Sequence, residues 1–365
     1  MSAPLSSRYD VGLFDLDGVC YLGNDSIPHA PEEVNRAVAG DFKNAYVTNN
    51  ASRPREDVAQ QLSGMGFPAT AATVLTSAEI AVDMTLRLFG EDATALIIGG
   101  PGLRKAARNA SLTAVESADD RPDVVLQGFS PDVGWPELSE AALAIRAGAT
   151  YIATNLDKTI PRERGLMVGN GSLVTAVAVS TGATPLSAGK PEPEIFRAAA
   201  ALMEAERPLA IGDNLDTDIK GAVAAGIDSM HVLTGLASAR DICLAPSDVR
   251  PTYLCDDMRG LNEPYPEVLI EVGDGRSRQT GDELIDDGEE IGSGADAKAG
   301  TVTVGSAQAR WTESGVRLFG EREIDVAGGA TLNLDEYRAL VHAAWKAADA
   351  GADLDAAVGE ITVVR

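Results

Sequence analysis

The sequence is poor in cysteine, histidine and aromatic residues, and it has no long apolar run. Three cysteines and three histidines are scattered over 365 residues without the spacing of metal ligands. This pattern predicts reduced thiols and no zinc site. No apolar run reaches the length of a membrane span, and the first residues, MSAPLSSRYD, lack the features of a secretory signal. We therefore expect a cytoplasmic protein with no membrane partner.

Positive charge is also scarce. The chain has 30 lysine and arginine residues against 55 aspartate and glutamate residues, which gives a formal net charge of −25. Because this field would repel a polyanion, nucleic acid is not an expected partner. An acidic protein that handles phosphate groups needs a metal ion and a few well-placed cations.

Short apolar runs alternate with helical stretches up to about residue 260. This alternation predicts an α/β fold with a doubly wound, Rossmann-like parallel sheet covered by helices. The predicted strands are residues 11–14, 44–48, 94–100, 123–129, 150–155, 208–213 and 229–233. The predicted helices include residues 30–40, 53–66, 135–148 and 191–205, several with proline near the start or glycine at the end.

The composition changes after about residue 265. Residues 271–300 are rich in glycine and acidic residues, and they are expected to form a loop or flexible surface. An amphipathic helix is predicted at 334–351, with strand-like residues at 301–305 and 360–364. We expect a small α+β appendage over 266–365, whose role the sequence leaves open; a binding or oligomerisation module is the alternative function that this part of the chain suggests. Its segment RQTGDELIDDG is too acidic for a coenzyme A pyrophosphate loop, so a second enzymatic activity is not expected.

Two aspartates, Asp15 and Asp17, directly follow the apolar run 11–14 and precede Gly18. Open α/β sheets bind their ligands at the carboxyl ends of strands, which is where both carboxylates would lie. Two adjacent carboxylates repel, so in a site they share a proton or a metal ion. The alternative is a solvated turn that merely ends the strand.

Three further stretches have polar residues at the ends of predicted strands or the start of a helix. Thr48, Asn49 and Asn50 end the strand 44–48 and offer donors for a phosphate oxygen. Lys190 precedes the proline that opens the helix 191–205, so its ammonium would lie beside a helix N-terminus. Taken singly, the first is explained by an ordinary turn and the second by a surface lysine.

The third stretch, GDNLDTDI, places Asp213, Asp216 and Asp218 after the strand 208–213, with Thr217 predicted to cap the next helix. A capped helix start would explain it without a site. However, all four stretches share one topological position, and together they offer carboxylates for Mg²⁺ and a lysine and a hydroxyl for phosphoryl oxygens. This set suits phosphoryl transfer through an aspartyl-phosphate.

These four motifs, FDLDGV, VTNN, Lys190 before PEP, and GDNLDTDI, resemble those of the haloacid dehalogenase-like (HAD) phosphatases. Within this superfamily the chain is similar to the NagD-type group, which includes p-nitrophenylphosphatase-like, phosphoglycolate phosphatase-like and glycerol-3-phosphate phosphatase-like enzymes. Residues 153–177 are similar to the cap segment of that group, although VGNG lacks the expected proline before its first glycine. The resemblance covers roughly residues 8–260.

The resemblance implies a role for each motif residue. Asp15 would be the nucleophile, and Asp17 the general acid and then the base. Thr48 and Lys190 would hold the phosphoryl group, with Asn49 nearby. The implied metal ion is Mg²⁺, and its implied ligands and supporting residues are Asp15, the backbone carbonyl of Asp17, Asp213, Asn214 and Asp218.

The distance between Thr48 and Lys190 in the sequence is too long for one βα crossover, so an insertion is expected between them. We predict a catalytic core over 1–76 and 182–262 and an inserted cap domain over 77–181. A cap excludes water and admits small substrates. The resemblance implies a small phosphorylated metabolite, with glycerol 3-phosphate as first expectation and 2-phosphoglycolate as second. A homo-oligomer is a further expectation.

Four cap residues are candidates for contact with the leaving group: Asn155, Asp157, Arg162 and Arg164. The two arginines fit solvated surface charges equally well. A dehalogenase-like hydrolase that uses Asp15 alone is the alternative enzyme. It is disfavoured because that chemistry has no use for Asp17, Asp213 and a metal ion.

Overall fold

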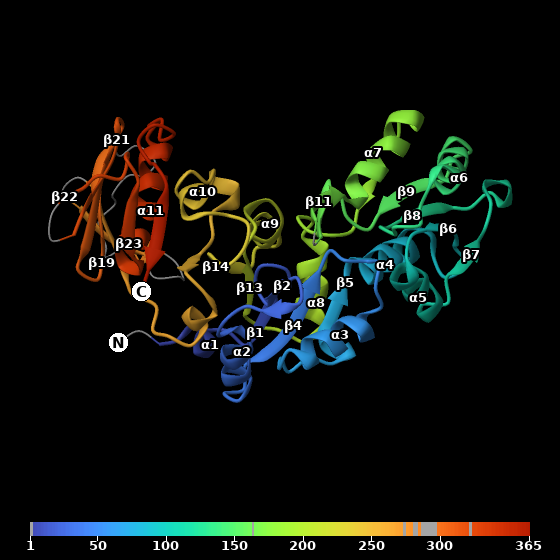
Figure 1. The fold of residues 1–365 in the computed structure, drawn as a ribbon, viewed down its shortest axis with the longest axis horizontal. Helices are drawn as coiled ribbons and strands as arrows, with labels where there is room; N and C mark the ends of the chain where they lie inside the picture. The colour runs from blue at the N-terminus through green and yellow to red at the C-terminus, as the bar shows by residue number, and fades with distance from the viewer. Residues whose placement is uncertain (1–2, 163, 273–274, 280–283, 286–297, 321–322) are drawn as a thin grey trace. The chain divides into compact units, whose positions relative to one another are not determined.

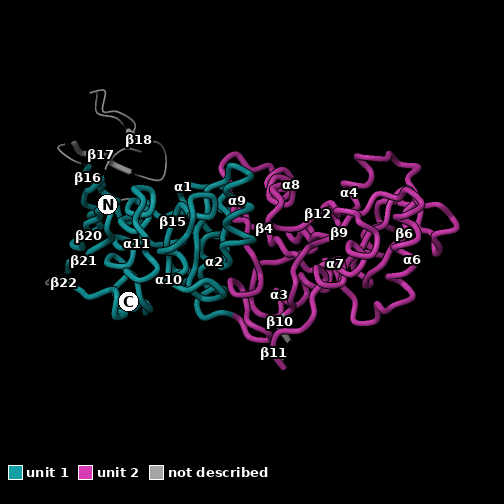
Figure 2. Tube along the Cα trace, turned by 90° about the horizontal axis from the view of Figure 1, so that it is seen from above, with its two compact units in different colours: residues 1–10, 27–42, 209–365 teal, residues 11–26, 43–208 magenta. Residues whose placement is uncertain are grey.

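The computed structural model describes residues 3–162, 164–272, 275–279, 284–285, 298–320 and 323–365. The chain forms two compact units, which Figure 2 colours separately. Unit 1 comprises residues 1–10, 27–42 and 209–365, and unit 2 comprises residues 11–26 and 43–208. None of the described helices is long and apolar enough to cross a membrane.

Unit 2 contains the strands that carry the first two motifs. β1 (Val11–Phe14), β4 (Lys43–Thr48) and β5 (Val74–Thr76) pair in parallel, and nearly all their residues are buried. The helices α3 (Arg55–Gly64) and α8 (Glu194–Leu202) pack against these strands. The strands predicted at 11–14 and 44–48 are confirmed. β5 was not predicted because three residues are too few to show a period.

Unit 2 also contains a second, fully parallel sheet in the order β12-β9-β8-β6-β7. Its strands are β6 (Thr94–Ile98), β7 (Thr113–Val115), β8 (Val124–Gln127), β9 (Thr150–Ala153) and β12 (Leu186–Ser187). The helices of this region are α4 (Ser77–Phe89), α5 (Pro101–Asn109), α6 (Trp135–Arg146) and α7 (Asn170–Thr181). Three strands and the helix predicted here are confirmed. β12 lies beyond the boundary expected at residue 181, and the proposed domain limits stay a prediction.

A short antiparallel hairpin, β10 (Thr159–Arg162) and β11 (Gly165–Val168), follows β9 in unit 2. The sequence did not predict it. Pro161 lies within β10, and proline inside a short run argues against a strand unless that strand lies at an edge.

Unit 1 contains three further parallel strands, β13 (Pro208–Gly212), β14 (Asp228–Val232) and β15 (Tyr253–Cys255). The helices of this part are α1 (Leu5–Arg8), α2 (Ala30–Val38), α9 (Lys220–Ala225) and α10 (Ala239–Cys243). The predicted strands at 208–213 and 229–233 are confirmed. The core strands of both units are parallel, as expected for the doubly wound fold.

The C-terminal part of unit 1 is an antiparallel sheet in the order β18-β17-β16-β19-β20-β21-β22. Figure 1 shows β19, β21 and β22 of this sheet beside α11. Its strands are β16 (Val268–Val272), β17 (Gly275–Gln279), β18 (Leu284–Ile285), β19 (Ala299–Val304), β20 (Ala307–Thr312), β21 (Gly315–Phe319) and β22 (Glu323–Ile324). The helix α11 (Leu334–Asp349) packs on β19, β20 and β21. β23 (Ala330–Asn333) and β24 (Ile361–Val364) form a separate parallel pair.

The α+β appendage is therefore present, with one correction. A loop was expected over 271–300, but β17 pairs with β16 along its whole length. The strand β17 forms through backbone hydrogen bonds to β16. The segment has no apolar pattern from which a strand could be predicted. Residues 273–274, 280–283 and 286–297 of that predicted loop lie outside the described residues.

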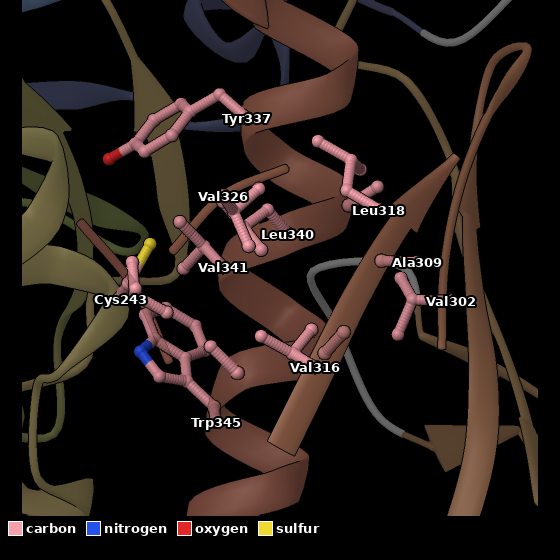
Figure 3. Packing of buried hydrophobic residues seen from close by; sticks show 14 of the residues in the cluster. Cys243, Val302, Ala309, Val316, Leu318, Val326, Tyr337, Leu340, Val341 and Trp345 are labelled. Carbon is pink, nitrogen blue, oxygen red and sulfur yellow. The ribbon is translucent and has the colours of Figure 1, made fainter. Parts of the chain in front are cut away.

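The helix α11 lies between the C-terminal sheet and α10 (Figure 3). Leu318, Ala309 and Val302 contribute to the cluster from the strands, and Cys243 lies beside Trp345 on the other side. The indole Nε1 of Trp345 donates to the carbonyl of Ile242 at 2.7 Å. The appendage thus shares one continuous apolar core with the α10 region.

His342 is buried on α11, and its ring is expected to make stability fall in acid. Burial, together with the neighbouring cations of Lys346, Arg338 and Arg250, lowers its pKa to about 4. Between pH 6.5 and 4 the unfolded chain binds a proton at this site and the folded chain does not. The free energy of unfolding therefore decreases as the pH falls through this window.

Replacing His342 with glutamine should reduce the loss of stability between pH 7 and pH 4.5 by about 2 to 3 kcal/mol. Urea unfolding at a series of pH values measures this. The exposed His29 supplies the matched control, His29→Asn, which should keep the wild-type pH dependence. An unchanged pH dependence in His342→Gln would contradict the prediction.

Candidate active site

Asp15 and Asp17 lie in the loop after β1, on either side of Leu16. Leu16 is buried, and its carbonyl accepts hydrogen bonds from the backbone of Val19, Cys20 and Tyr21. Asp15 is partly exposed and Asp17 is exposed. Gly18 has a φ of 84°, a conformation that favours glycine, and its N–H donates to the carbonyl of Tyr21. The apolar anchor therefore leaves both carboxyl groups at the end of the strand.

Lys190 lies against Asp15, although 175 residues separate them in the sequence. Its Nζ is 2.5 Å from Asp15 Oδ1 and 3.4 Å from the carbonyl oxygen of Val47. Only 3% of the lysine side chain is exposed. A buried ammonium needs a charged or strongly polar partner, so this lysine is not a solvated surface group.

The predicted start of the helix after Lys190 is wrong. Residues 189–192 form a turn, in which Glu192 N–H donates to the carbonyl of Gly189, and α8 begins at Glu194. Two prolines in PEPE remove backbone donors and delay the helix. The ammonium of Lys190 is thus placed by its partners in the β1 and β4 region.

Thr48 ends β4 in unit 2, and Asn49 follows it. Thr48 is buried, and its Oγ1 accepts from the N–H of Asn50 at 3.1 Å. The carboxamide of Asn49 bonds to the backbone of Lys190. The structure therefore brings Asp15, Thr48, Asn49 and Lys190 into the same part of unit 2.

Two of the four cap candidates reach this loop. Asn155 is buried, and its Nδ2 donates to the carbonyl of Asn49 at 2.7 Å. The Nδ2 of Asn49 in turn lies 3.2 and 3.3 Å from the carboxylate oxygens of Asp157. Arg164 is exposed in the turn between β10 and β11, as expected for a solvated charge. The backbone of Arg162 ends β10, and its side chain lies outside the described part of the chain.

Asp213 follows β13 in unit 1, and only 1% of it is exposed. Its Oδ2 accepts from the N–H of Leu236 at 2.6 Å, and its carbonyl oxygen lies 3.1 Å from His231 Nε2. Burial lowers the pKa of His231 to about 4. A Cβ on Gly235 would lie 1.8 Å from Asp213 Oδ2, so a side chain there would displace the carboxylate.

Asn214 and Asp218 form a small network after Asp213. Asn214 Oδ1 accepts from the N–H of Asp216, and Asp218 Oδ2 accepts from the N–H of Asn214. Asn214 is therefore the N-cap of the turn Leu215–Ile219, and the prediction that Thr217 would cap it is wrong. The turn is a π-helix that begins earlier than the helical pattern of the sequence indicates. Asp218 is 2% exposed, and Gly212 leaves room for it.

The side chains of Asp213 and Asp218 suit a hard divalent cation. Both are buried carboxylates in unit 1, and a buried carboxylate is costly without compensating charge. Mg²⁺ takes oxygen ligands and is commonly held by one or two carboxylates plus water. The chemistry of these residues fits Mg²⁺.

Sequence reasoning missed Gly235 and His231, which surround Asp213. A signal existed only for the glycine, which follows the predicted strand 229–233 in the segment TGLAS. It also left Cys20 without a role, and the structure shows its Sγ donating to the carbonyl of Asp15 at 3.2 Å.

Comparisons with known proteins agree with this arrangement. A family model described as haloacid dehalogenase-like hydrolase matches residues 12–113, and a second, HAD-hydrolase-like, matches residues 187–261. D-glycerol 3-phosphate phosphatase of Mycobacterium tuberculosis is 40% identical over 298 residues, which cover 80% of this chain and 84% of that protein. Acid sugar phosphatase of Staphylococcus haemolyticus is 38% identical over 253 residues, which cover 69% and 94%.

Solved structures give the same result. A glycerol phosphate phosphatase from Mycobacterium tuberculosis, solved with magnesium, is similar with a TM-score of 0.74 and 33% identity, over 100% of this chain and 96% of that chain. A thermostable NPPase from Geobacillus stearothermophilus has a TM-score of 0.63 and 32% identity, over 69% and 97%. The chain belongs to the haloacid dehalogenase-like hydrolases, and within them to the phosphatases of the NagD type.

Proposed function

We propose that this protein is a Mg²⁺-dependent phosphatase that hydrolyses a small phosphate monoester through an aspartyl-phosphate. The observation that carries the proposal is the buried Lys190 against Asp15, directly after the strand that ends in FDLDG. An ammonium in this place offsets the negative charge of the nucleophile and of an incoming phosphate ester. Membership of the phosphatases supports the reaction class.

In the first step, a carboxylate oxygen of Asp15 attacks phosphorus and the bond between phosphorus and the ester oxygen breaks. Asp17 gives its proton to the leaving alkoxide, which departs as an alcohol. In the second step, water attacks the aspartyl-phosphate, Asp17 takes its proton, and inorganic phosphate leaves Asp15. The exposure of Asp17 supports this role, because both the leaving group and water must reach it. Thr48 and Lys190 would hold the phosphoryl oxygens.

The proposed ligands of Mg²⁺ are the carboxylates of Asp15 and Asp213 and the backbone carbonyl of Asp17. Asn214 and Asp218 would hold Asp213 and its loop in place. Bound Mg²⁺ supplies positive charge that offsets the carboxylates and the phosphate ester.

Glycerol 3-phosphate is the first proposed substrate, and 2-phosphoglycolate the second. The names of the relatives from Mycobacterium tuberculosis support the first. Asn155 and Asp157 are the proposed cap residues nearest to the leaving group, because both contact Asn49, which directly follows Thr48. Phosphate release from a panel of small phosphate esters, measured with and without Mg²⁺, tests the assignment. A homo-oligomer and a cytoplasmic location stay predictions.

Removal of the metal ion is expected to stop the reaction. Treatment with EDTA should lower phosphate release from p-nitrophenyl phosphate by more than about a hundredfold, because the carboxylates would then repel the ester. Added Mg²⁺ should restore it. Circular dichroism before and after chelation controls for unfolding. Full phosphate release in EDTA would contradict the metal dependence, and it would remove the metal-based argument against the dehalogenase-like alternative.

A further inference from the structure

The carboxamide of Asn49 holds the backbone of Lys190 at two points. Its Oδ1 accepts from the N–H of Lys190 at 2.7 Å, and its Nδ2 donates to the carbonyl of Lys190 at 3.0 Å. These two groups belong to residues 141 positions apart in the sequence. A carboxamide bonded to both backbone groups of one residue fixes the position and the orientation of that residue.

The neighbouring Gly189 makes this close approach feasible. A Cβ built on Gly189 would lie 2.5 Å from Asn49 Oδ1 and 2.7 Å from the carbonyl oxygen of Thr154. A side chain there would push Asn49 away from Lys190. The glycine of the SAGKP segment therefore serves the contact between these two residues.

The polar atoms of the Asn49 side chain are already used within unit 2. One N–H of Nδ2 is directed to the carbonyl of Lys190, and the other is shared between the two carboxylate oxygens of Asp157. Oδ1 accepts from Lys190. Because a carboxamide nitrogen has only two hydrogens, none remains for a phosphoryl oxygen.

The backbone carbonyl of Asn49 also bonds to two further segments. It accepts from Ser77 Oγ at the start of α4 and from Asn155 Nδ2 after β9, both at 2.7 Å. Asn155 is fixed in turn by Asn170, whose Nδ2 donates to its carbonyl at 2.8 Å. The loop after β4 is thereby tied both to the catalytic lysine and to the segment 155–157.

We propose that Asn49 is a positioning residue, which sets the backbone of Lys190 so that its ammonium meets Asp15 and the phosphoryl group. This proposal rests on the proposed phosphatase function. Lysine has a long flexible side chain, and a buried ammonium keeps one place only if its backbone is fixed as well. A displacement of about 1 Å at a reacting group lowers rates by up to about a hundredfold. The contact to Asp157 makes the same carboxamide sensitive to the position of the segment 155–157.

Replacing Asn49 with alanine tests the proposal on the full-length protein with p-nitrophenyl phosphate and Mg²⁺. We expect kcat to fall by about 10- to 100-fold while KM changes by less than about threefold, because Lys190 is needed most when charge develops in the transition state. Inhibition by vanadate, a mimic of that state, should weaken in parallel with kcat. Asn49→Asp keeps the shape and the acceptor, but it loses the donor to Lys190 and places a second carboxylate beside Asp157. It should therefore also lower kcat at nearly constant KM. This variant replaces Asn49→Ala in the test if the alanine variant does not fold.

Asn44 provides a matched control. It is a buried asparagine on β4, the strand that precedes Asn49, and its Nδ2 donates to the carbonyl of Pro68. Asn44→Ala should lower the melting temperature and keep kcat within about threefold of wild type. A rise in KM at constant kcat in the Asn49 variants, or a kcat equal to wild type, would overturn the positioning role. An inactive wild-type enzyme on all esters would instead refute the phosphatase function itself.

Discussion

Asp15→Asn is expected to lower phosphate release from p-nitrophenyl phosphate by more than about a thousandfold. A carboxamide has nearly the shape of the carboxylate, but it lacks the charge and the nucleophilic oxygen that attacks phosphorus. The variant also removes the anionic partner of the buried Lys190 ammonium. A discontinuous assay of inorganic phosphate with Mg²⁺ in excess measures the effect.

Folding of this variant must be checked separately, because Lys190 is buried and would lose its charged partner. Circular dichroism and thermal melting serve this purpose. Asp92→Asn is the matched control, since Asp92 is exposed in the turn before β6, and it should keep wild-type activity. A folded and fully active Asp15→Asn would exclude the covalent route through this residue.

The core motifs could be predicted because their signals are local. In FDLDG an apolar strand, two aspartates and a glycine are contiguous, and the strand and the positive φ of Gly18 follow from these residues. The same reasoning places Thr48 at the end of β4 and Asp213 after β13. The site could be predicted because these motifs all lie at the ends of strands; no single residue would have been enough.

The contacts that fix the site could not be predicted, because they join distant segments. Nothing in VTNN indicates that Asn49 bonds to a residue 141 positions later, and nothing near Asp213 indicates that Gly235 must lack a side chain. The strand β17 could not be predicted for the same reason, because it is defined by its pairing with β16. The error at Thr217 has another cause: Asn214 and Thr217 are both good caps, and only the π-helical turn decides between them.

Removing residues 266–365 is expected to cost the protein its folded state. The deletion would uncover Ile242, Cys243 and Leu254, which are buried in the cluster shared with the appendage. It would also remove the indole of Trp345, and burial of one large aromatic side chain alone contributes about 3 to 5 kcal/mol. Since domains are stable by only about 5 to 15 kcal/mol, we expect aggregation or a melting temperature lower by tens of degrees. Thermal melting and binding of a hydrophobic dye to the fragment 1–265 measure this.

The relatives make this test informative. The NPPase from Geobacillus stearothermophilus is covered over 97% of its length by only 69% of this chain, so a protein of this family folds without such an appendage. We therefore expect this chain to differ from that NPPase in the surface that the appendage covers. Arg250 donates to Asp349, and Arg338 Nε donates to the carbonyl of Leu254. Polar as well as apolar groups of this surface therefore contact α11. If the fragment 1–265 keeps the wild-type melting temperature and kinetics and differs only in its mass in solution, the appendage serves assembly, because a structural dock would not leave the core unaffected.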